Sequence, residues 1–531
     1  MDANAALPDD PELLKAMIRE LLACLKGTQQ ELAGVRQRLD QLLRRLYGPK
    51  SEAFRPDQPN LFALLDEPPA EPAPTAPVSD APGSPEPASK PKPKRGHGRR
   101  RLPDDLPRER VVHDLSEAEK LCPCCQSLRV KMGEESSEQL DYRPAALFVR
   151  EHVRLKYTCT KCLKTQTSEA SDAPVSPIVV APKPPQPIDG GLPGPGLLAH
   201  VVVSKYCDHL PLHRQESILA RHGVELARST MCDWVAAVAN LLLPIYHAML
   251  RDTLLSRVVQ TDETHVPVQE PGSRKTKSGR LWIYVGDRNH PHLVYDYTPT
   301  KARAGPAKFL QGYRGYLQAD AANVFDGLYR PGGIVEVGCW AHARRYFHEA
   351  RDTDPIRSAE ALARIGAFYG IEHEVSERAL RENLIGDAAE ALRLHERRER
   401  TLPKLHEFAA WLTEQSPRVL PKSPLGQALA YAQRQWPALV RFTEAGYLAI
   451  DNNASERALR AVAVGRKNWL FAGSDAGGKT AAVLYTLVQS CKRQGLDPFA
   501  YLQDVLTRWP SAGSTSALDF APARWSATRP L

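Results

Sequence analysis

The sequence predicts a multidomain α/β protein, and three observations carry this expectation. With 531 residues the chain is too long for one ordinary core and suits about three or four domains. Strand-like apolar runs between residues 258 and 297 give way to alternating helical and strand-like segments, which indicates a mixed sheet with helices packed on it. Two C-x-x-C pairs stand apart from that region and indicate a separate metal-binding unit.

The composition excludes several classes of protein. Charged residues make up 25% and apolar residues 42%, as in globular chains, and the net charge of +8 permits a polyanionic partner. The acidic first ten residues lack the pattern of a signal peptide. The most apolar stretch, residues 234–250, is short and contains Asn240, Pro244 and His247, which favours a buried helix over a membrane span. We therefore expect a cytoplasmic protein without a membrane partner.

A heptad pattern over residues 1–50 predicts a coiled coil of the leucine-zipper type. The first seam position recurs every seven residues, and the second follows three residues later. The two sets are Ile18, Leu25, Leu32, Leu39 and Leu46, and Leu21, Thr28, Val35 and Leu42. Self-association through this seam predicts a homo-oligomer, and the alternative is one amphipathic helix packed on the chain's own core.

Residues 51–107 read as a Pro-rich linker that ends in a basic run. Residues 56–93 are rich in Pro, Ala, Glu and Ser and lack the apolar surface needed to fold. Seven Lys or Arg residues fall within residues 90–101, a pattern that neutralises phosphates without reading sequence. The expected DNA contacts in this run are Lys94, Arg95, Arg99, Arg100 and Arg101. The alternative is a solvated basic tail.

The paired cysteines predict a zinc-binding, ribbon-like domain over residues 108–168. Cys122 and Cys125 form one C-x-x-C pair, and Cys159 and Cys162 form the other after 33 intervening residues. Four thiolates from two such pairs make a closed, tetrahedral, structural Zn²⁺ site. Cys124 competes with Cys125 for one ligand position. Clustered cysteines without an export signal favour metal over disulfides.

After a second linker over residues 169–196, residues 197–252 predict a helical region with a helix-turn-helix outline. One helix covers residues 210–223 and closes at Gly223, and a second opens with a capping pattern over residues 230–233. Such a pair suits DNA reading. Ordinary core packing is the equal alternative.

Residues 253–352 predict the first part of a ribonuclease-H-like core. We expect three meandering strands, then helix and strand in alternation. The strands fall at residues 258–268, 280–285, 292–297, 315–320 and 333–340, and the helices at residues 305–311, 321–329 and 342–348. In this order the first and fourth strands lie side by side, so Asp262 and Asp320 should be neighbours.

The remaining chain predicts a helical insertion over residues 353–448, the last part of the core over residues 449–490, and a small C-terminal domain with a tail over residues 491–531. The resumed core begins with a helix that carries Glu456, with Asn453 as its expected N-cap. Asp262, Asp320 and Glu456 would form a hard-oxygen cage for Mg²⁺ or Mn²⁺. Two such ions catalyse in-line phosphoryl transfer.

Several neighbouring residues compete with these assignments or add to them. Asp451 lies close to Glu456, Asp326 follows Asp320, and Glu263 should point to the opposite face of the strand from Asp262. The expected phosphate contacts near the third carboxylate are Arg457, Arg460, Arg466 and Lys467, with a solvated face as the alternative. Residues 473–480 match a nucleotide-binding loop after a strand-like segment at 468–471, but the 51 residues that follow leave no room for that domain.

The sequence resembles the DDE transposases of the insertion-sequence-66 family over nearly its whole length. The matching segments are residues 205–214 (KYCDHLPLHR), 261–264 (TDET), 317–320 (LQAD), 338–345 (GCWAHARR), 452–460 (NNASERALR) and 465–475 (GRKNWLFAGSD).

The resemblance implies that Asp262, Asp320 and Glu456 are the catalytic, metal-binding triad of an enzyme that cleaves and joins DNA. It also implies a leucine zipper, a zinc-binding domain, a C-terminal domain around residues 496–506 and accessory proteins encoded by the same element. The expected DNA partners are the terminal repeats of the element and target DNA, which places the bound protein at the nucleoid. The alternative is a catalytically inactive, zinc-containing DNA-binding regulator derived from such an enzyme.

Overall fold

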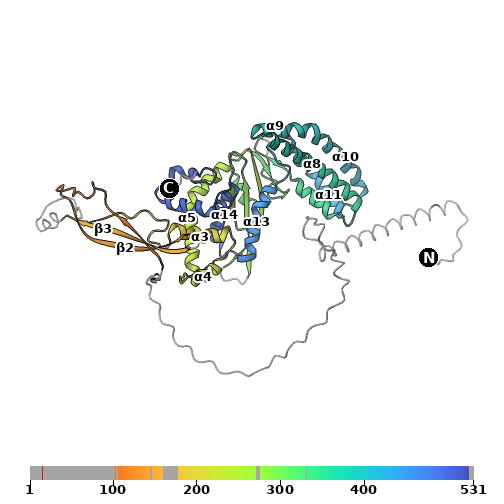
Figure 1. Ribbon diagram of the computed structural model, residues 1–531. Coiled ribbons are helices and arrows are strands. Elements are labelled where there is room, and N and C mark those ends of the chain that lie inside the picture. The colour runs from red at the N-terminus through yellow and green to blue at the C-terminus, as the bar shows by residue number, and fades with distance from the viewer. Residues whose placement is uncertain are drawn as a thin grey trace, which may run out of the picture.

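The described residues form a β-ribbon, a central α/β body and a helical unit (Figure 1). The computed structural model describes residues 106–143, 146–159, 178–270, 275–329, 332–512 and 514–525, together with Lys15, Leu102 and Asp104. The expected coiled coil over residues 1–50 lies outside this set except for Lys15. The basic run with Lys94, Arg95, Arg99, Arg100 and Arg101 lies outside it entirely.

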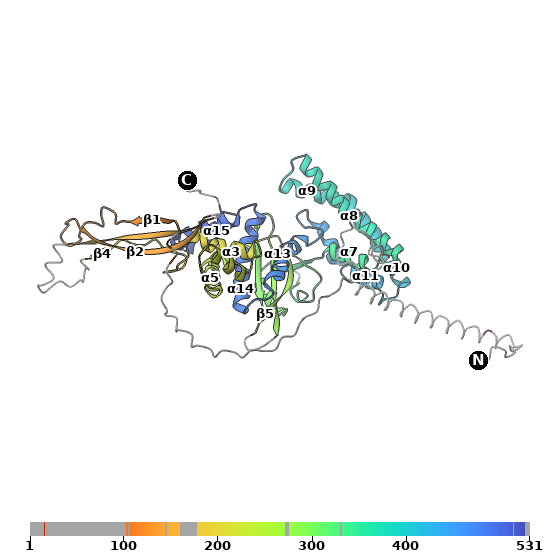
Figure 2. The same cartoon turned by 60° about the horizontal axis from the view of Figure 1, so that its bottom comes forward.

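The β-ribbon is a long hairpin with a short strand on each half of one edge. Its strands are β1 (Arg108–His113), β2 (Val130–Arg143), β3 (Ala146–Thr158) and β4 (Ile178–Val180). The two long strands β2 and β3 are antiparallel, whereas β1 runs parallel to β3 and β4 runs antiparallel to it. The ribbon projects from the central body (Figure 2). This pattern agrees with the strand-like sequence between the two cysteine pairs.

A buried aspartate joins the base of the ribbon to the helices of the central body. Asp141 on β2 accepts a hydrogen bond from the backbone N–H of Leu197 (3.1 Å), in the first turn of α3 (Pro195–Tyr206). It also pairs with Arg150 Nη1 at 3.1 Å. A Cβ at Gly196 would lie 2.6 Å from Asp141 Oδ1, so this close approach requires glycine.

The helical region expected at residues 197–252 consists of three helices. They are α3, α4 (Leu212–Arg221) and α5 (Arg228–Thr253). The helix α5 begins two residues before Thr230 and has no side-chain cap, so the predicted capping box is wrong. Apolar packing fixes its start instead, because Met231, Trp234 and Val235 are buried within the first two turns.

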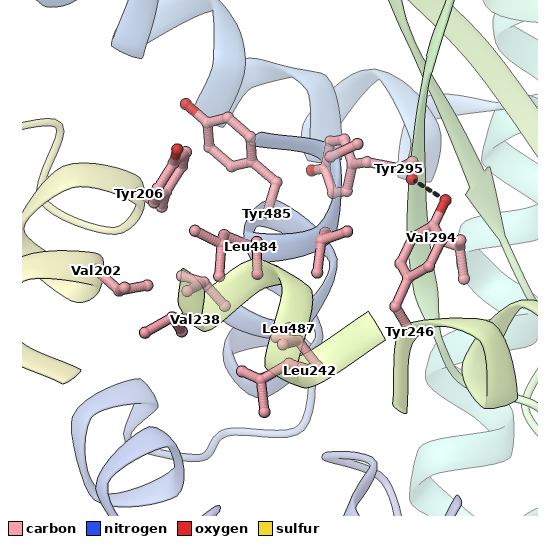
Figure 3. Close-up of a cluster of buried hydrophobic side chains, with 14 of the residues drawn as sticks. Val202, Tyr206, Val238, Leu242, Tyr246, Val294, Tyr295, Leu484, Tyr485 and Leu487 are labelled. Carbon is pink, nitrogen blue, oxygen red and sulfur yellow. Dashed lines mark hydrogen bonds between the residues drawn. The ribbon is translucent and has the colours of Figure 1, made fainter. Parts of the chain in front are cut away.

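The apolar helix α5 lies in the core of the central body. It is long and apolar enough to cross a membrane by length and composition, but half of its most apolar window is buried against the rest of the protein. Val238 and Leu242 of α5 lie beside Leu484 and Leu487 in the core cluster (Figure 3). The Tyr246 hydroxyl donates a hydrogen bond to the Tyr295 carbonyl at 2.9 Å. The expected buried helix is confirmed.

The central sheet has the order β7-β6-β5-β8-β9. Its strands are β5 (Val258–Gln269), β6 (Thr276–Val285), β7 (Leu293–Thr298), β8 (Gly315–Gln318) and β9 (Ile334–Val337). The first three form an antiparallel meander, and β8 and β9 add to β5 in parallel. The expected pairing of the first and fourth strands is therefore confirmed.

The helix expected at residues 321–329 is wrong, because the chain makes successive turns there after the short helix α6 (Ala304–Phe309) and β8. Phe325 is 1% exposed and meets the Trp282 ring edge-on at 5.9 Å. Burying this one ring on the sheet draws the segment across the strands, and a regular helix would not follow that path.

The segment expected as a helical insertion is mostly helical, and its apolar residues pack together with Val258 of β5 and Val337 of β9. Its principal helices are α8 (Pro355–Arg381), α9 (Asp387–Glu396), α10 (Leu402–Gln415), α11 (Pro424–Arg434) and α12 (Trp436–Val440), and α7 (Trp340–Glu349) leads into it. Arg397, in the single π-helical turn Arg397–Thr401, is 1% exposed and pairs with Glu372 at 2.7 and 2.8 Å. Its guanidinium also donates to three carbonyls of the returning chain, those of Phe442, Ala445 and Leu448.

The returning chain supplies α13 (Asn453–Trp469), α14 (Asp475–Arg493), α15 (Pro498–Ala512) and the short 3₁₀ segment Ser514–Phe520. The helix α14 covers the edge strand β7: Thr486 Oγ1 accepts from the backbone N–H of Tyr295 (2.9 Å), and Ser490 Oγ from that of Leu293 (3.0 Å). These contacts satisfy backbone groups that an edge strand would otherwise leave unpaired. Since α13 continues to Trp469, the strand expected at residues 468–471 is wrong.

Candidate active site

Two parallel strands bring Asp262 and Asp320 to matching positions. The last registered pair between β5 and β8 is Gln260 with Gln318, and each aspartate follows its glutamine by two residues. Gln260 Nε2 donates to Gln318 Oε1 at 2.9 Å, which fixes this register on the side-chain level as well. Parallel neighbours lie about 4.8 Å apart. The two carboxylates therefore lie at corresponding positions of two neighbouring interior strands, just beyond the last residue of β8.

The start of α13 places Glu456 near the strand that carries Asp262. The N-cap is Asn452, not Asn453, and its side chain does not cap the helix. Asp451 caps the helix instead, because its Oδ1 accepts a hydrogen bond from the backbone N–H of Asn453 at 3.1 Å. Asn452 is fully buried and its Nδ2 donates to the carbonyl of Thr261 at 3.4 Å, next to Asp262. This contact ties the helix that carries Glu456 to the strand that carries Asp262.

The electrostatics agree with a common site for the three carboxylates. Burial, together with the neighbouring negative charges of Asp320 and Glu456, raises the pKa of Asp262 to about 7. Glu456 Oε1 is buried and accepts no hydrogen bond; His342 Nε2 lies 3.7 Å from it, and burial lowers the pKa of that imidazole. Crowded carboxylates with an unsatisfied buried oxygen fit the ligand set of a divalent cation, since a cation relieves both costs.

The three carboxylates do not form a tight single-ion cluster. Across the described ranges, only Cys122, Cys125 and Cys159 have ligand atoms that all lie within 4.8 Å of one another. A wider spacing suits oxygens that share more than one ion, because paired ions in phosphoryl-transfer sites lie about 3.5–4 Å apart.

The competing carboxylates have other partners. Asp451 Oδ2 accepts from Asn453 Nδ2 (2.7 Å) and from the Tyr369 hydroxyl (3.0 Å). Glu263 pairs with Arg280 Nη1 (3.2 Å) and Lys301 Nζ (2.7 Å). Both carboxylates therefore have structural contacts in the fold.

A cavity of about 350 Å³ opens beside Glu456. Its charged and polar lining comes from three elements: Arg344 and Arg345 on α7, Tyr369 on α8, and Asn453 with Glu456 on α13. Arg345 Nη2 lies 4.0 Å from Glu456 Oε2. Sequence reasoning missed the two arginines and Tyr369. The sequence signal for the arginines was their place on the helix that follows β9. Because β9 is the parallel neighbour of β8, both strands end at the same end of the sheet.

The basic residues of α13 fall into two groups. Arg457, Arg460 and Lys467 are exposed and recur at helical spacing along one side of α13. Arg466 is half-buried, and its Nη1 donates to the carbonyl of His265 and lies 3.1 Å from His265 Nδ1 on β5. Its main contact is thus with the sheet, which the sequence did not indicate.

The cysteines at the far end of the ribbon come together. Cys125 Sγ and Cys159 Sγ are 3.6 Å apart, and Cys122 Sγ completes a group within 4.8 Å. Two thiolates on a tetrahedral zinc ion, each about 2.3 Å from it, would lie about 3.8 Å apart, so these residues fit the ion. Cys124 is exposed outside the group, which resolves its competition with Cys125. Cys162 lies outside the described residues.

The segment at residues 473–480 is the start of a helix and not a nucleotide loop. Ser474 Oγ accepts from the backbone N–H of Gly477 at 3.1 Å and so caps α14. Asp475 places a carboxylate in the first turn, paired with Lys277 Nζ at 2.7 Å and the Tyr297 hydroxyl at 2.6 Å. That negative charge takes the place a phosphate would need, so the structure supports the exclusion of nucleotide binding.

Comparison with family models matches four segments of the chain. Residues 190–480 match the model described as "Transposase IS66 family", and residues 119–162 match the "zinc-finger binding domain of transposase IS66". Residues 35–111 match "Transposase C of IS166 homeodomain", and residues 486–519 match the "IS66 C-terminal element". The second match contains all four paired cysteines, and the first contains Asp262, Asp320 and Glu456.

Similar proteins occur in Sinorhizobium fredii. Uncharacterized protein y4jD is 33% identical over 427 residues, which cover 78% of this chain and 79% of that protein. Uncharacterized protein y4qI is 31% identical over 555 aligned positions, which cover 96% of each chain. The family model spans more than half of the chain, and these relatives align along most of their own length. The chain belongs to the IS66 transposase family.

Proposed function

We propose that this protein is a DDE-type transposase that cleaves DNA at the ends of a mobile element and joins those ends to target DNA. The observation that carries the proposal is that Asp262 and Asp320 follow matching positions of the neighbouring strands β5 and β8, and that the charges of Asp320 and Glu456 act on Asp262. The strand order, with β8 and β9 added in parallel to an antiparallel meander, supports a ribonuclease-H-like core. The family supplies the reaction class.

The three carboxylates hold the divalent ions, Mg²⁺ or Mn²⁺. When bound, two such ions supply Lewis acidity to the attacking and leaving oxygens of an in-line phosphoryl transfer. The raised pKa of Asp262 reflects the cost of an anion there without a cation beside it. Arg344 and Arg345 line the cavity next to Glu456 and provide charge for a phosphate of the bound strand.

The zinc-binding domain holds a structural Zn²⁺ through Cys122, Cys125, Cys159 and Cys162. Three of these thiols already lie within ligand distance of a common centre. A closed four-thiolate site contributes folding energy and has no position for substrate, so the ion stabilises the end of the ribbon.

The partners that follow are DNA and further copies of the chain. Arg457, Arg460 and Lys467 contact phosphates near the active site, and Lys94, Arg95, Arg99, Arg100 and Arg101 add sequence-independent affinity. The heptads of residues 1–50 form the homo-oligomer. Accessory proteins encoded by the same element complete the assembly, and the protein acts in the cytoplasm at the nucleoid.

The test converts each of the three carboxylates to its amide and measures strand cleavage and joining with Mg²⁺. Asp262→Asn, Asp320→Asn and Glu456→Gln should each nearly abolish both reactions, and combining them should add little, because the three act as one unit. DNA binding should persist, since phosphate contacts come mainly from Lys and Arg.

The matched controls are Asp326→Asn, an exposed carboxylate six residues after Asp320, and Glu263→Gln on the opposite face of β5. Both should keep cleavage. Normal cleavage by all three amide variants would overturn the assignment. A wild-type protein that binds the element's ends but never cleaves them would favour the DNA-binding regulator.

A further inference from the structure

The turn after α13 presents two apolar side chains to solvent. Leu470 is 65% exposed and Phe471 is 43% exposed, and Val464, one turn and a half earlier on α13, is 41% exposed. Large apolar groups gathered at one tip indicate a contact surface rather than scattered surface residues.

The backbone of this tip is strained. Leu470 has φ +60° and ψ −49°, and the N–H of Phe471 donates to the carbonyl of Trp469 at 2.7 Å. This is a γ-turn of the positive-φ kind, which is rare and strained. Among the described residues, four that are not glycine have positive φ: Gln126, His209, Asn383 and Leu470. Leu470 is the only apolar residue of these four. Strain of this type concentrates at functional sites.

Contacts on both sides hold the tip rigidly. Before it, a Cβ at Gly465 would lie 2.6 Å from Trp469 Nε1 and 2.8 Å from the Tyr485 hydroxyl, so glycine lets the Trp469 ring fold back into the body. After it, the N–H of Ala472 donates to the carbonyl of Pro267, and the carbonyl of Ala472 accepts from Gln269, both at 2.8 Å on β5. The tip is therefore preorganised rather than loose.

The charge around the tip matches DNA. Arg457, Arg460 and Lys467 are exposed and recur at helical spacing along α13, between Glu456 at its start and the tip at its end. Fourteen residues separate Glu456 from Leu470, which is about 21 Å at about 1.5 Å per residue. At about 3.4 Å per base pair this distance corresponds to about six base pairs.

We infer that Leu470 and Phe471 are an apolar wedge that enters the base stack of the bound DNA about six base pairs from the phosphate that is cleaved. Proteins that kink a duplex insert Leu, Phe or similar side chains between base steps and hold the backbone on either side with Lys and Arg. The wedge opens the duplex and fixes its register on α13. This inference rests on the proposed action on DNA.

The test places the fluorescent base 2-aminopurine at successive steps of a duplex taken from the terminus of the encoding element. Binding of the full-length wild-type protein should raise the fluorescence severalfold at one step, about six base pairs from the cleaved phosphate, because the base is unstacked there. The double variant Leu470→Ala/Phe471→Ala should lose this rise and bind about tenfold more weakly. Leu380→Ala, which removes a 79% exposed leucine from α8, is the matched control and should keep the rise.

Folding is controlled with a second variant. Leu470→Asn places a residue that tolerates positive φ at the strained position, so it should keep the melting temperature and still lose the fluorescence rise. An unchanged rise in the double variant would overturn the inference. A changed sedimentation coefficient with an unchanged rise would show that the tip contacts protein instead.

Failure of the wedge and failure of the proposed function give different results. Asp262→Asn should show the full fluorescence rise without cleaving. If the wild-type protein raises the fluorescence but never cleaves, the wedge stands and the proposed enzyme activity falls.

Discussion

Two half-buried aspartates of the central sheet have raised pKa values in opposite electrostatic settings. Burial raises the pKa of Asp262 to about 7 with three carboxylates nearby, whereas burial raises the pKa of Asp296 to about 6 although Lys308 and Lys479 oppose the shift. Asp262 lies among other carboxylates, and a divalent cation would relieve the repulsion between their negative charges. Asp296 has cations nearby already, so its raised pKa is a cost of packing on β7 and does not mark a metal site.

At this scale we predict that Asp296→Asn stabilises the protein at neutral pH. The unfolded carboxyl ionises near its ordinary value of 3.8, whereas the folded protein keeps the proton up to about pH 6. The unfolded state therefore binds fewer protons in this window, so stability falls as the pH rises from about 4 to about 6 and stays lower above it. The amide removes this loss, worth about 2–3 kcal/mol at neutral pH.

The measurement is the free energy of unfolding of the central body at pH 4.5 and pH 7.5, for the wild type and the variant. The difference between the two proteins should grow with pH in favour of the variant. Asp326→Asn, an exposed carboxylate, should show no such growth. A constant difference across this range would contradict the prediction.

The helices and strands that depend on a local sequence pattern were predicted. Those that depend on a single contact with a distant residue were not. The strands that position Asp262 and Asp320 follow from their apolar runs, and their adjacency follows from strand order. The helix at residues 321–329 failed because the Phe325 ring packs on Trp282, a contact between residues 43 positions apart. The start of α13 was misplaced because Asp451 caps it from outside the helix.

The candidate site shows the same division. The expectation that Asp262, Asp320 and Glu456 share one site comes from local sequence patterns and strand order, and it stays a prediction. Arg344, Arg345 and Tyr369 line the same cavity as Glu456, and they were missed because local sequence does not show how α7 and α8 are placed relative to α13. The role of Arg466 as a contact to His265 depends on a neighbour 201 residues away, which no local pattern encodes.

The ribbon offers a prediction at the scale of an element. Its far end has a small core of Leu115, Val153, Leu155, Tyr157 and Ala181, whereas Leu140 and Val149 at its base belong to the core of the central body. A core of five residues is too small to hold structure alone, so the end depends on zinc while the base does not.

We therefore expect a zinc chelator to raise amide hydrogen exchange over residues 114–130 and 153–159 and to leave it unchanged at Leu140 and Val149. Cys159→Ser should have the same effect without chelator. The control is Cys124→Ser, because Cys124 is exposed outside the thiol group. Uniform exchange along the whole ribbon, or no zinc in the purified protein, would contradict the assignment.

On the scale of the whole molecule, the candidate site lies where the central sheet and the helical insertion meet. The insertion leaves after β9 and returns just before α13, and Arg397 holds the returning chain through three carbonyls. Glu456 therefore lies a few residues after the point where the insertion returns to the central body. The insertion also supplies Tyr369, whose hydroxyl donates to Asp451 beside the start of α13. One chain thus builds one complete set of carboxylates.

Because each chain carries one set of carboxylates, joining two element ends should require two chains, and the heptads of residues 1–50 are the expected contact between them. We predict that deleting residues 1–50 lowers the sedimentation coefficient of the protein. The deletion variant should still cleave a single end, because the described site contains no residue from that segment. Coupled joining of two ends should fall by at least tenfold, since the two chains then meet only by diffusion.

The matched control replaces Leu25 and Leu32 with Ala, which weakens the seam without shortening the chain. Unchanged sedimentation in both variants would mean that the heptads pack on their own chain, and a loss of single-end cleavage would mean that the segment supports the site directly.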